Sequence, residues 1–131
     1  MTGEASFQAE VISLAESLGL VALHVRQPRM EGGDWKGFPD LMIIAPGGGI
    51  IFRELKMPGK QLRAAQRDWA AVLGGQDFAV WKPADLHTGR IRAELEQLAG
   101  TELPAAAPTA QQRLWRALAA RAGTLPGGKP A

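Results

Sequence analysis

Two carboxylates and a lysine stand at the ends of the two most apolar runs of the sequence. Asp40 directly precedes the run 41–45, and Glu54 and Lys56 stand at the end of the run 50–55. Carboxylates that converge can hold a divalent cation, and an ammonium group beside them can position a water for hydrolysis. The alternative is that all three charges are solvated at a sheet edge, the commoner role of such a short motif taken alone.

The spacing of these residues allows the carboxylates to meet. The two runs, joined by a proline and three glycines, predict a β-hairpin. With the three glycines as its loop, Asp40 lies opposite Lys56, and Glu54 is its diagonal neighbour on the same face. Diagonal neighbours lie about 7–8 Å apart, close enough to share one cation. A loop shorter by one residue would send the carboxylates to opposite faces.

Two predicted helices carry further polar side chains beside apolar ones. Residues 60–73 predict a helix whose apolar stripe contains Gln66, and residues 6–18 predict a helix on which Glu10 borders the inward face. A buried amide or carboxylate needs a partner. A metal site at the end of the sheet would provide one for Glu10, and backbone or phosphate contacts would serve Gln66. Taken alone, Gln66 is more often a border residue and Glu10 is more often solvated.

The order of the predicted elements indicates an α/β fold with a small mixed sheet flanked by helices. The strand–helix–strand connection between the third and fourth strands should make those two strands parallel. The complete order is αβββαβα, with helices over 6–18, 60–73 and 90–99 and strands over 20–26, 41–45, 50–55 and 78–82.

The sequence changes character after Gly100. Residues 1–100 are expected to form one domain, and residues 101–131 a Pro- and Ala-rich linker, a short helix and a flexible C-terminal tail. The expected helix, residues 111–123, has an apolar patch of Leu114, Trp115 and Leu118. An isolated helix of this length is marginal in water, so it should dock either on its own core or on a second subunit.

Composition narrows the class of protein. The chain has 131 residues, a net charge of +2 and no cysteine, which excludes a disulfide scaffold and a thiolate zinc site. We expect neither a signal peptide nor a membrane span, and the cytoplasm is the expected location.

The basic residues are concentrated. Between Arg26 and Arg67 there are 8 basic and 4 acidic residues, so this segment could present a positive field to a polyanion such as DNA. The alternative is a solvated basic face. The candidate DNA-binding residues are Lys36, Lys60, Arg63 and Arg67.

Three stretches, KGFPDLMII, IIFRELK and RAAQRDWAAVLGGQDFAVWKP, together resemble the VRR-NUC nuclease family of the PD-(D/E)XK (restriction-endonuclease-like) superfamily, in its stand-alone short phage or bacterial form. The resemblance covers residues 6–98 and rests on Gly-x-Pro-Asp, a Glu-x-Lys after a hairpin and a Gln on the next helix. It implies a Mg²⁺- or Mn²⁺-dependent DNA endonuclease in a bacterial cell or a phage-infected host. It also implies homodimers and branched DNA substrates such as Holliday junctions.

The same resemblance implies a role for each matched residue. Asp40 and Glu54 would be metal ligands, with the backbone carbonyl of Leu55 as a third. Lys56 would position or activate the attacking water. The remaining two catalytic candidates are Glu10, which would complete the acidic cluster directly or through a water, and Gln66, which would support the site. The alternatives are a non-catalytic nucleic-acid-binding module of the same fold and an accessory protein.

Overall fold

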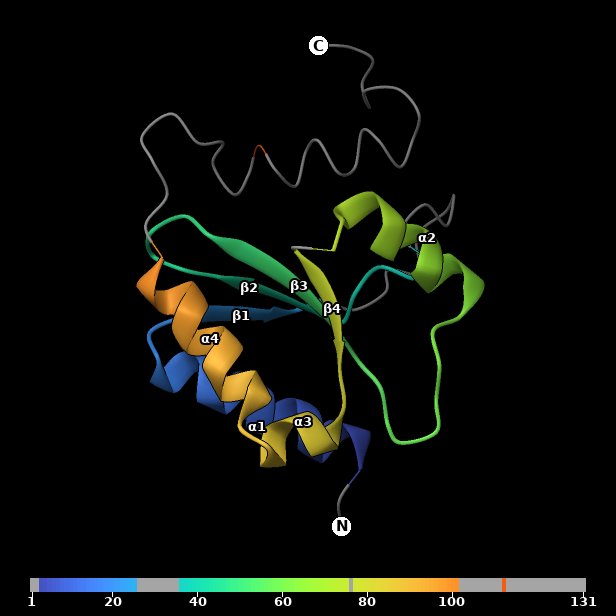
Figure 1. The fold of residues 1–131 in the computed structure, drawn as a ribbon, viewed down its shortest axis with the longest axis horizontal. Coiled ribbons are helices and arrows are strands. Elements are labelled where there is room, and N and C mark those ends of the chain that lie inside the picture. Colours follow the sequence, from blue (N-terminus) through green and yellow to red (C-terminus); the bar gives the residue numbers. More distant parts are fainter. Residues whose placement is uncertain (1–2, 26–35, 76, 102–111, 113–131) are drawn as a thin grey trace.

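The computed structural model describes residues 3–25, 36–75, 77–101 and 112 (Figure 1). Its elements follow the predicted order, with one additional short helix, α3. They are α1 (Glu4–Ser17), β1 (Val21–His24), β2 (Leu41–Ile44), β3 (Ile50–Leu55), α2 (Ala64–Leu73), β4 (Phe78–Trp81), α3 (Pro83–His87) and α4 (Arg90–Gly100). Within the described ranges, no helix combines the length and the apolar character that a membrane crossing requires.

Two helix starts differ from the prediction, and both have local causes. The helix expected from residue 60 begins at Ala64, because Arg63 has an extended backbone and its N–H donates to the Gln66 side chain at 2.8 Å. Helix α3 has too few residues to show an apolar period. It is started instead by Pro83, which suits the first helical turn, and by Asp85, which accepts the Lys82 N–H at 2.8 Å.

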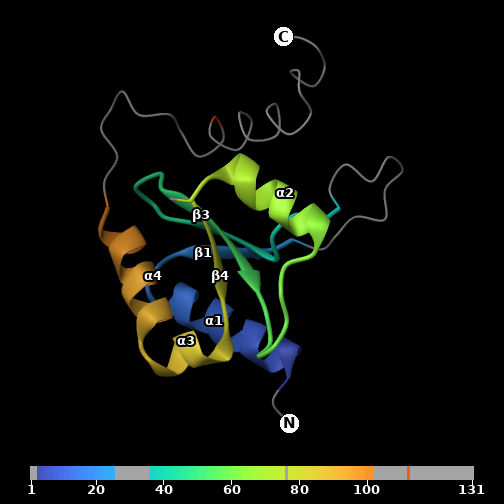
Figure 2. The same ribbon diagram turned by 45° about the vertical axis from the view of Figure 1, so that its right-hand side comes forward.

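The sheet has four strands in the order β1-β2-β3-β4. Strands β1 and β2 are antiparallel, as are β2 and β3, whereas β3 and β4 are parallel. The prediction that β3 and β4 would be parallel is therefore confirmed. The structure is a mixed α/β fold in which a small sheet is flanked by helices (Figures 1 and 2).

The predicted register of the β2–β3 hairpin was wrong by two residues. Ile44 pairs with Ile50, so the connection comprises five residues rather than three, and Ala45 N–H donates to the Gly49 carbonyl at 2.8 Å. The predicted register required Pro46 to pair as a strand residue, although proline has no N–H to donate to a ladder. Side chains alternate along a strand, so an error of two residues does not move a side chain to the other face. The residues of β2 and β3 therefore project to the predicted faces of the sheet.

Two apolar clusters lie on the two faces of the sheet. Helices α1 and α4 pack on one face, where their buried side chains meet Leu41, Ile43 and Leu55 of the strands. Helix α2 packs on the other face, where Trp69 and Leu73 meet a cluster that contains Phe52. Because side chains alternate along a strand, the even-numbered residues of β2 and β3 face α2.

A close backbone approach fixes the segment before β2 against α2. Gly37 has φ +83°, and a Cβ at this position would lie 2.5 Å from the carbonyl carbon of Ala65. Only glycine fits such a site without a backbone shift. The next residue, Phe38, is buried edge-on against Trp69 with ring centroids 4.8 Å apart. The Gly-x-Pro-Asp stretch therefore holds Asp40 at a fixed position beside the first turn of α2.

Candidate active site

Asp40 and Glu54 meet at one end of the sheet, on the face that α2 covers. If the β2–β3 register is extended by one residue, Asp40 lies opposite Glu54 rather than opposite Lys56 as predicted. Asp40 is half-buried, and its Oδ2 accepts the backbone N–H of Leu55 at 2.9 Å. Glu54 is only 3% exposed. The two carboxylates therefore lie closer than the diagonal arrangement that the sequence predicted.

The pKa of the Glu54 carboxyl is raised to about 8, well above its usual value of 4.5. Burial is the largest cause, and the negative charge of Asp40 is the next, while Lys56 acts in the opposite direction. A buried carboxylate beside a second carboxylate is unfavourable unless a cation compensates it. The pair therefore has the electrostatic character of a cation site.

Gln66 connects this pair to α2. Its Nε2 donates to Glu54 Oε2 at 2.7 Å, and its Oε1 accepts the backbone N–H of Arg63 at 2.8 Å. The side chain is 3% exposed, and both hydrogen bonds are made with groups fixed by secondary structure. The amide therefore has one orientation, with its NH₂ towards the carboxylate, and it holds Glu54 in place.

Lys56 lies on the same side of β3 as Glu54. Its Nζ is 3.9 Å from Glu54 Oε2, at the outer limit of an ion pair, and its side chain is 14% exposed. Its backbone N–H donates to the carbonyl of Trp81 in the parallel neighbour β4 at 3.0 Å. The main chain of Lys56 is thus fixed, while its ammonium group is within reach of both the carboxylate and a molecule bound beside it.

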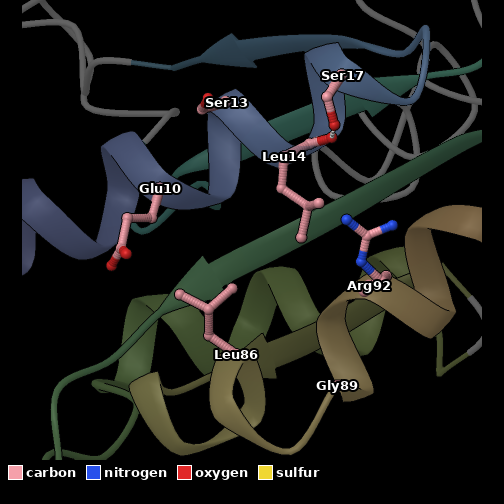
Figure 3. A pocket seen from close by; sticks show the side chains of 7 residues that line it. All are labelled: Glu10, Ser13, Leu14, Ser17, Leu86, Gly89 and Arg92. Carbon is pink, nitrogen blue, oxygen red and sulfur yellow. Dashed lines mark hydrogen bonds between the residues drawn. The ribbon is translucent and has the colours of Figure 1, made fainter.

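Glu10 is not brought into a group of three carboxylates with this pair. Within the described residues, no set of three or more His, Asp or Glu side chains is placed to hold one metal ion. The physical reason is the layering, because α1 packs on the face of the sheet opposite to α2. Glu10 is exposed and lines a pocket between α1, α3 and α4 (Figure 3). A contribution of Glu10 to the site through water stays a prediction.

The four candidate DNA-binding side chains are exposed, and three of them lie at or just before the start of α2. Lys60 precedes the helix, Arg63 is its N-cap residue, and Arg67 lies one turn further on. The guanidinium group of Arg67 donates to the Leu62 carbonyl at 2.7 Å. Gln66, which contacts Glu54, lies between Arg63 and Arg67 in the sequence of this first part of α2. Lys36 is exposed on the segment that precedes β2.

The donor set fits a hard divalent cation. Mg²⁺ is usually held by one or two carboxylates, with waters and substrate phosphates completing its six ligands. Asp40 and Glu54 supply two carboxylates on one face, and all donors here are oxygen atoms, which favour Mg²⁺ or Mn²⁺ over Zn²⁺. The backbone N–H of Leu55 already donates to Asp40, whereas a metal contact by the Leu55 carbonyl stays a prediction.

Sequence analysis missed a second charged cluster, on the opposite face of β3. Arg53 is 6% exposed, and it donates to the Phe52 and Asp77 carbonyls at 2.8 and 3.0 Å and to Glu94 at 3.1 Å. Trp81 donates to the same Glu94 oxygen at 2.8 Å. The signal was present in the sequence, because Arg53 alternates with buried apolar residues on an inward face.

The protonation states of this cluster are those of an ion pair. Burial lowers the pKa of Arg53, and the negative charge of Glu94 partly reverses this decrease. Burial alone would raise the pKa of Glu94, but hydrogen bonds from Arg90 and Trp81, together with the Arg53 charge, bring it below its usual value. The cluster connects β3, β4 and α4, and its contacts hold these three elements together.

The sequence matches no protein-family profile, and neither curated proteins nor solved structures provide a match.

Proposed function

We propose that this protein is a Mg²⁺- or Mn²⁺-dependent DNA endonuclease with a PD-(D/E)XK fold of the VRR-NUC type, acting in the cytoplasm. One observation supports it above all, the pairing of half-buried Asp40, directly before β2, with buried Glu54 of β3, together with a raised Glu54 pKa and the Gln66 amide at 2.7 Å. Strongly perturbed carboxylates with a specific charge partner are typical of functional sites.

Each residue of the site would have a separate role in the reaction. Asp40 and Glu54 would hold the cation, which when bound neutralises charge on the scissile phosphate. Gln66 keeps the Glu54 carboxylate in a single orientation towards it. Lys56, whose ammonium group lies 3.9 Å from Glu54, would position the attacking water or a phosphate oxygen. Hydrolysis of the phosphodiester then gives one phosphomonoester end and one hydroxyl end.

The surroundings of the pair suit a polyanionic substrate. Lys60, Arg63 and Arg67 are exposed at the start of α2, on the helix that carries Gln66. Phosphate contacts from such residues place a DNA backbone without reading its sequence. We propose branched DNA, such as a four-way junction, as the substrate and a homodimer as the working unit, since two sites related by a twofold axis could cut two equivalent strands.

Cleavage assays on matched substrates test the proposal. Purified protein is incubated with a four-way junction, a duplex of the same sequence and supercoiled plasmid, each with Mg²⁺, Mn²⁺ or EDTA. We expect cleavage with either metal, none with EDTA, and preference for the junction. Light scattering at micromolar concentration should give twice the chain mass of 14.0 kDa.

The decisive variants change one charge each. Asp40→Asn and Glu54→Gln should abolish cleavage while the fold remains intact. Glu96→Gln is the matched control, since Glu96 is an exposed acid on α4 whose ion pair within the described residues is with Arg92, and it should retain full activity. Glu10→Gln asks whether this exposed carboxylate takes part. Wild-type cleavage by both Asp40→Asn and Glu54→Gln would refute the site and with it the proposed function.

A further inference from the structure

One part of the sheet surface is apolar and is not covered by any of the described residues. Val21 and Leu23 of β1 are 54% and 45% exposed, and they are the large apolar side chains that are exposed within the described ranges. Their cross-strand partners on β2 are Ile44 and Met42, both half-buried. Because residues opposite one another in an antiparallel pair share a face, these four side chains form one surface, which we call the β1–β2 patch.

The β1–β2 patch lies on the face of the sheet that α2 covers only in part. Met42 and Ile44 pack at the border of the cluster that contains Trp69 and Leu73 of α2. Helix α2 contacts the β4 side of the sheet, while α1 contacts β1 from the opposite face (Figure 2). Among the described elements, the helical layer on this face therefore does not extend to β1.

We propose that residues 111–123 of the same chain dock on the β1–β2 patch and complete this layer. The sequence predicts a helix there, with Leu114, Trp115 and Leu118 as an apolar patch that needs a partner. Of this segment the structure describes only Gln112, which is exposed. The inference does not depend on nuclease activity.

The connection before this segment starts at the correct end of the sheet. Helix α4 ends at Gly100, and Leu98 packs against Gly49 of the β2–β3 turn, where an added Cβ would lie 2.9 Å from Leu98 Cδ1. Ile44 precedes the same turn, and Val21 lies opposite it. The chain therefore leaves α4 at the end of the sheet where the β1–β2 patch begins (Figure 1).

The connection is also long enough. If each helical layer lies about as far from the sheet as a stacked sheet does, roughly 10 Å, the path from the α4 layer round to the α2 layer is about 20 Å. Residues 101–110 span up to about 33 Å when extended. The segment can therefore reach the β1–β2 patch of its own chain without any change in the described fold.

The size of the patch favours the chain's own segment over a second copy. A stable interface between two proteins buries about 800 Å² on each partner and involves about 20–30 residues a side. Four side chains provide much less than this. A tethered segment is present at an effective concentration in the millimolar range, so a small apolar contact is enough to hold it.

Cross-linking in this cysteine-free chain provides a direct test. Leu23→Cys with Leu118→Cys places one thiol on the β1–β2 patch and one on the segment. Ala93→Cys with Leu118→Cys is the control, because Ala93 is exposed on α4 at the other face of the sheet. Both proteins are treated with a short bismaleimide and analysed by denaturing electrophoresis and mass spectrometry.

We expect the Leu23/Leu118 pair to form an intramolecular cross-link at least about tenfold faster than the control pair, because docking raises the effective concentration of one thiol near the other. Adding Trp115→Ser should reduce its rate to that of the control. Equal rates for the two pairs, or a cross-link between the thiol at position 23 of one chain and the thiol at position 118 of another identified by mass spectrometry, would overturn the proposal, the latter because a second copy would then be the occupant. Folding of each variant is checked by far-UV circular dichroism.

Discussion

Replacing Glu54 by glutamine removes the negative charge that β3 buries and changes little else. The new side chain has almost the same shape, and its oxygen can still accept the hydrogen bond that Gln66 donates to Glu54 at 2.7 Å. The electrostatic cost of the Glu54–Asp40 pair should disappear in this variant. We therefore expect Glu54→Gln to change the pH dependence of stability rather than the fold.

The sign and size of the effect follow from the raised pKa of Glu54. The carboxyl binds its proton up to a pH of about 8 in the folded chain, but only up to about 4.5 in the unfolded one. The folded state therefore holds more protons between these values, and stability falls as the pH rises from about 4.5 to about 8. At 1.36 kcal/mol per pH unit, the total loss is at most about 5 kcal/mol. Glu54→Gln should remove this loss.

Urea denaturation in EDTA, repeated between pH 5 and pH 9, measures this loss. Tryptophan fluorescence is a suitable signal, since Trp69 and Trp81 are 1% and 0% exposed in the folded chain. Wild type and Glu54→Gln should have similar free energies of unfolding near pH 5. Near pH 9 the variant should be more stable by up to about 5 kcal/mol.

Two further measurements separate this cause from others. Glu96→Gln removes an exposed charge and should follow the wild-type profile within about 0.5 kcal/mol. Saturating Mg²⁺ should stabilise wild type near pH 9 and leave Glu54→Gln almost unchanged, because a ligand stabilises only the state that binds it. A wild-type stability that is constant or rises from pH 5 to pH 9 in EDTA would refute the reasoning.

Three other outcomes follow from the geometry. Neutralising Arg63 and Arg67 together should reduce the slope of log Kd against log salt by about 1.8 for duplex DNA, measured by fluorescence anisotropy, and an unchanged slope would mean that they are a solvated face. Glu94→Gln should lower the free energy of unfolding by about 3 kcal/mol in urea, since it leaves the Arg53 charge buried without its partner. Gly37→Ala should lower the thermal midpoint, because φ is +83° and the new Cβ would lie 2.5 Å from a carbonyl carbon of α2; an unchanged midpoint would contradict the close approach.

Much of the fold could be predicted from the sequence because its signals are local. The periods of the apolar residues located α1, α4 and the four strands, and the connection through α2 was enough to predict a parallel β3–β4 pair. Helix α3 was missed because its start depends on a proline and one capping carboxylate rather than on an apolar period. The expectation that Leu114, Trp115 and Leu118 form an apolar patch on a helix concerns residues outside the described ranges.

The candidate site was harder to predict, because contacts across strands and layers are not local. The sequence predicted correctly that Asp40 and Glu54 share a face of the sheet, because an error of two residues in the hairpin register keeps each side chain on its face. An error of one residue would have placed the two carboxylates on opposite faces. Helical spacing could place Glu10 at the border of α1 but could not tell which face of the sheet α1 would cover. Gln66 was singled out because an amide in an apolar stripe needs a partner, and the structure provides two.

The two neighbouring charges of β3 differ in how the fold compensates them. All six residues of β3 are buried, and Arg53 and Glu54 project to opposite faces of the same strand. Arg53 has a carboxylate at 3.1 Å, two carbonyl oxygens and the ring of Trp81, whose centroid lies 4.9 Å away. Glu54 has a second carboxylate as its neighbour, and the Lys56 ammonium group lies 3.9 Å away.

Burial alone cannot explain this difference, because both side chains are almost equally buried. The fold compensates the charge of Arg53 closely, whereas Asp40 adds to the charge of Glu54. Such an incompletely compensated pair costs stability, and strongly perturbed carboxylates of this kind gather at functional sites. A divalent cation bound between Asp40 and Glu54 would supply on the α2 face the compensation that Glu94 supplies on the other.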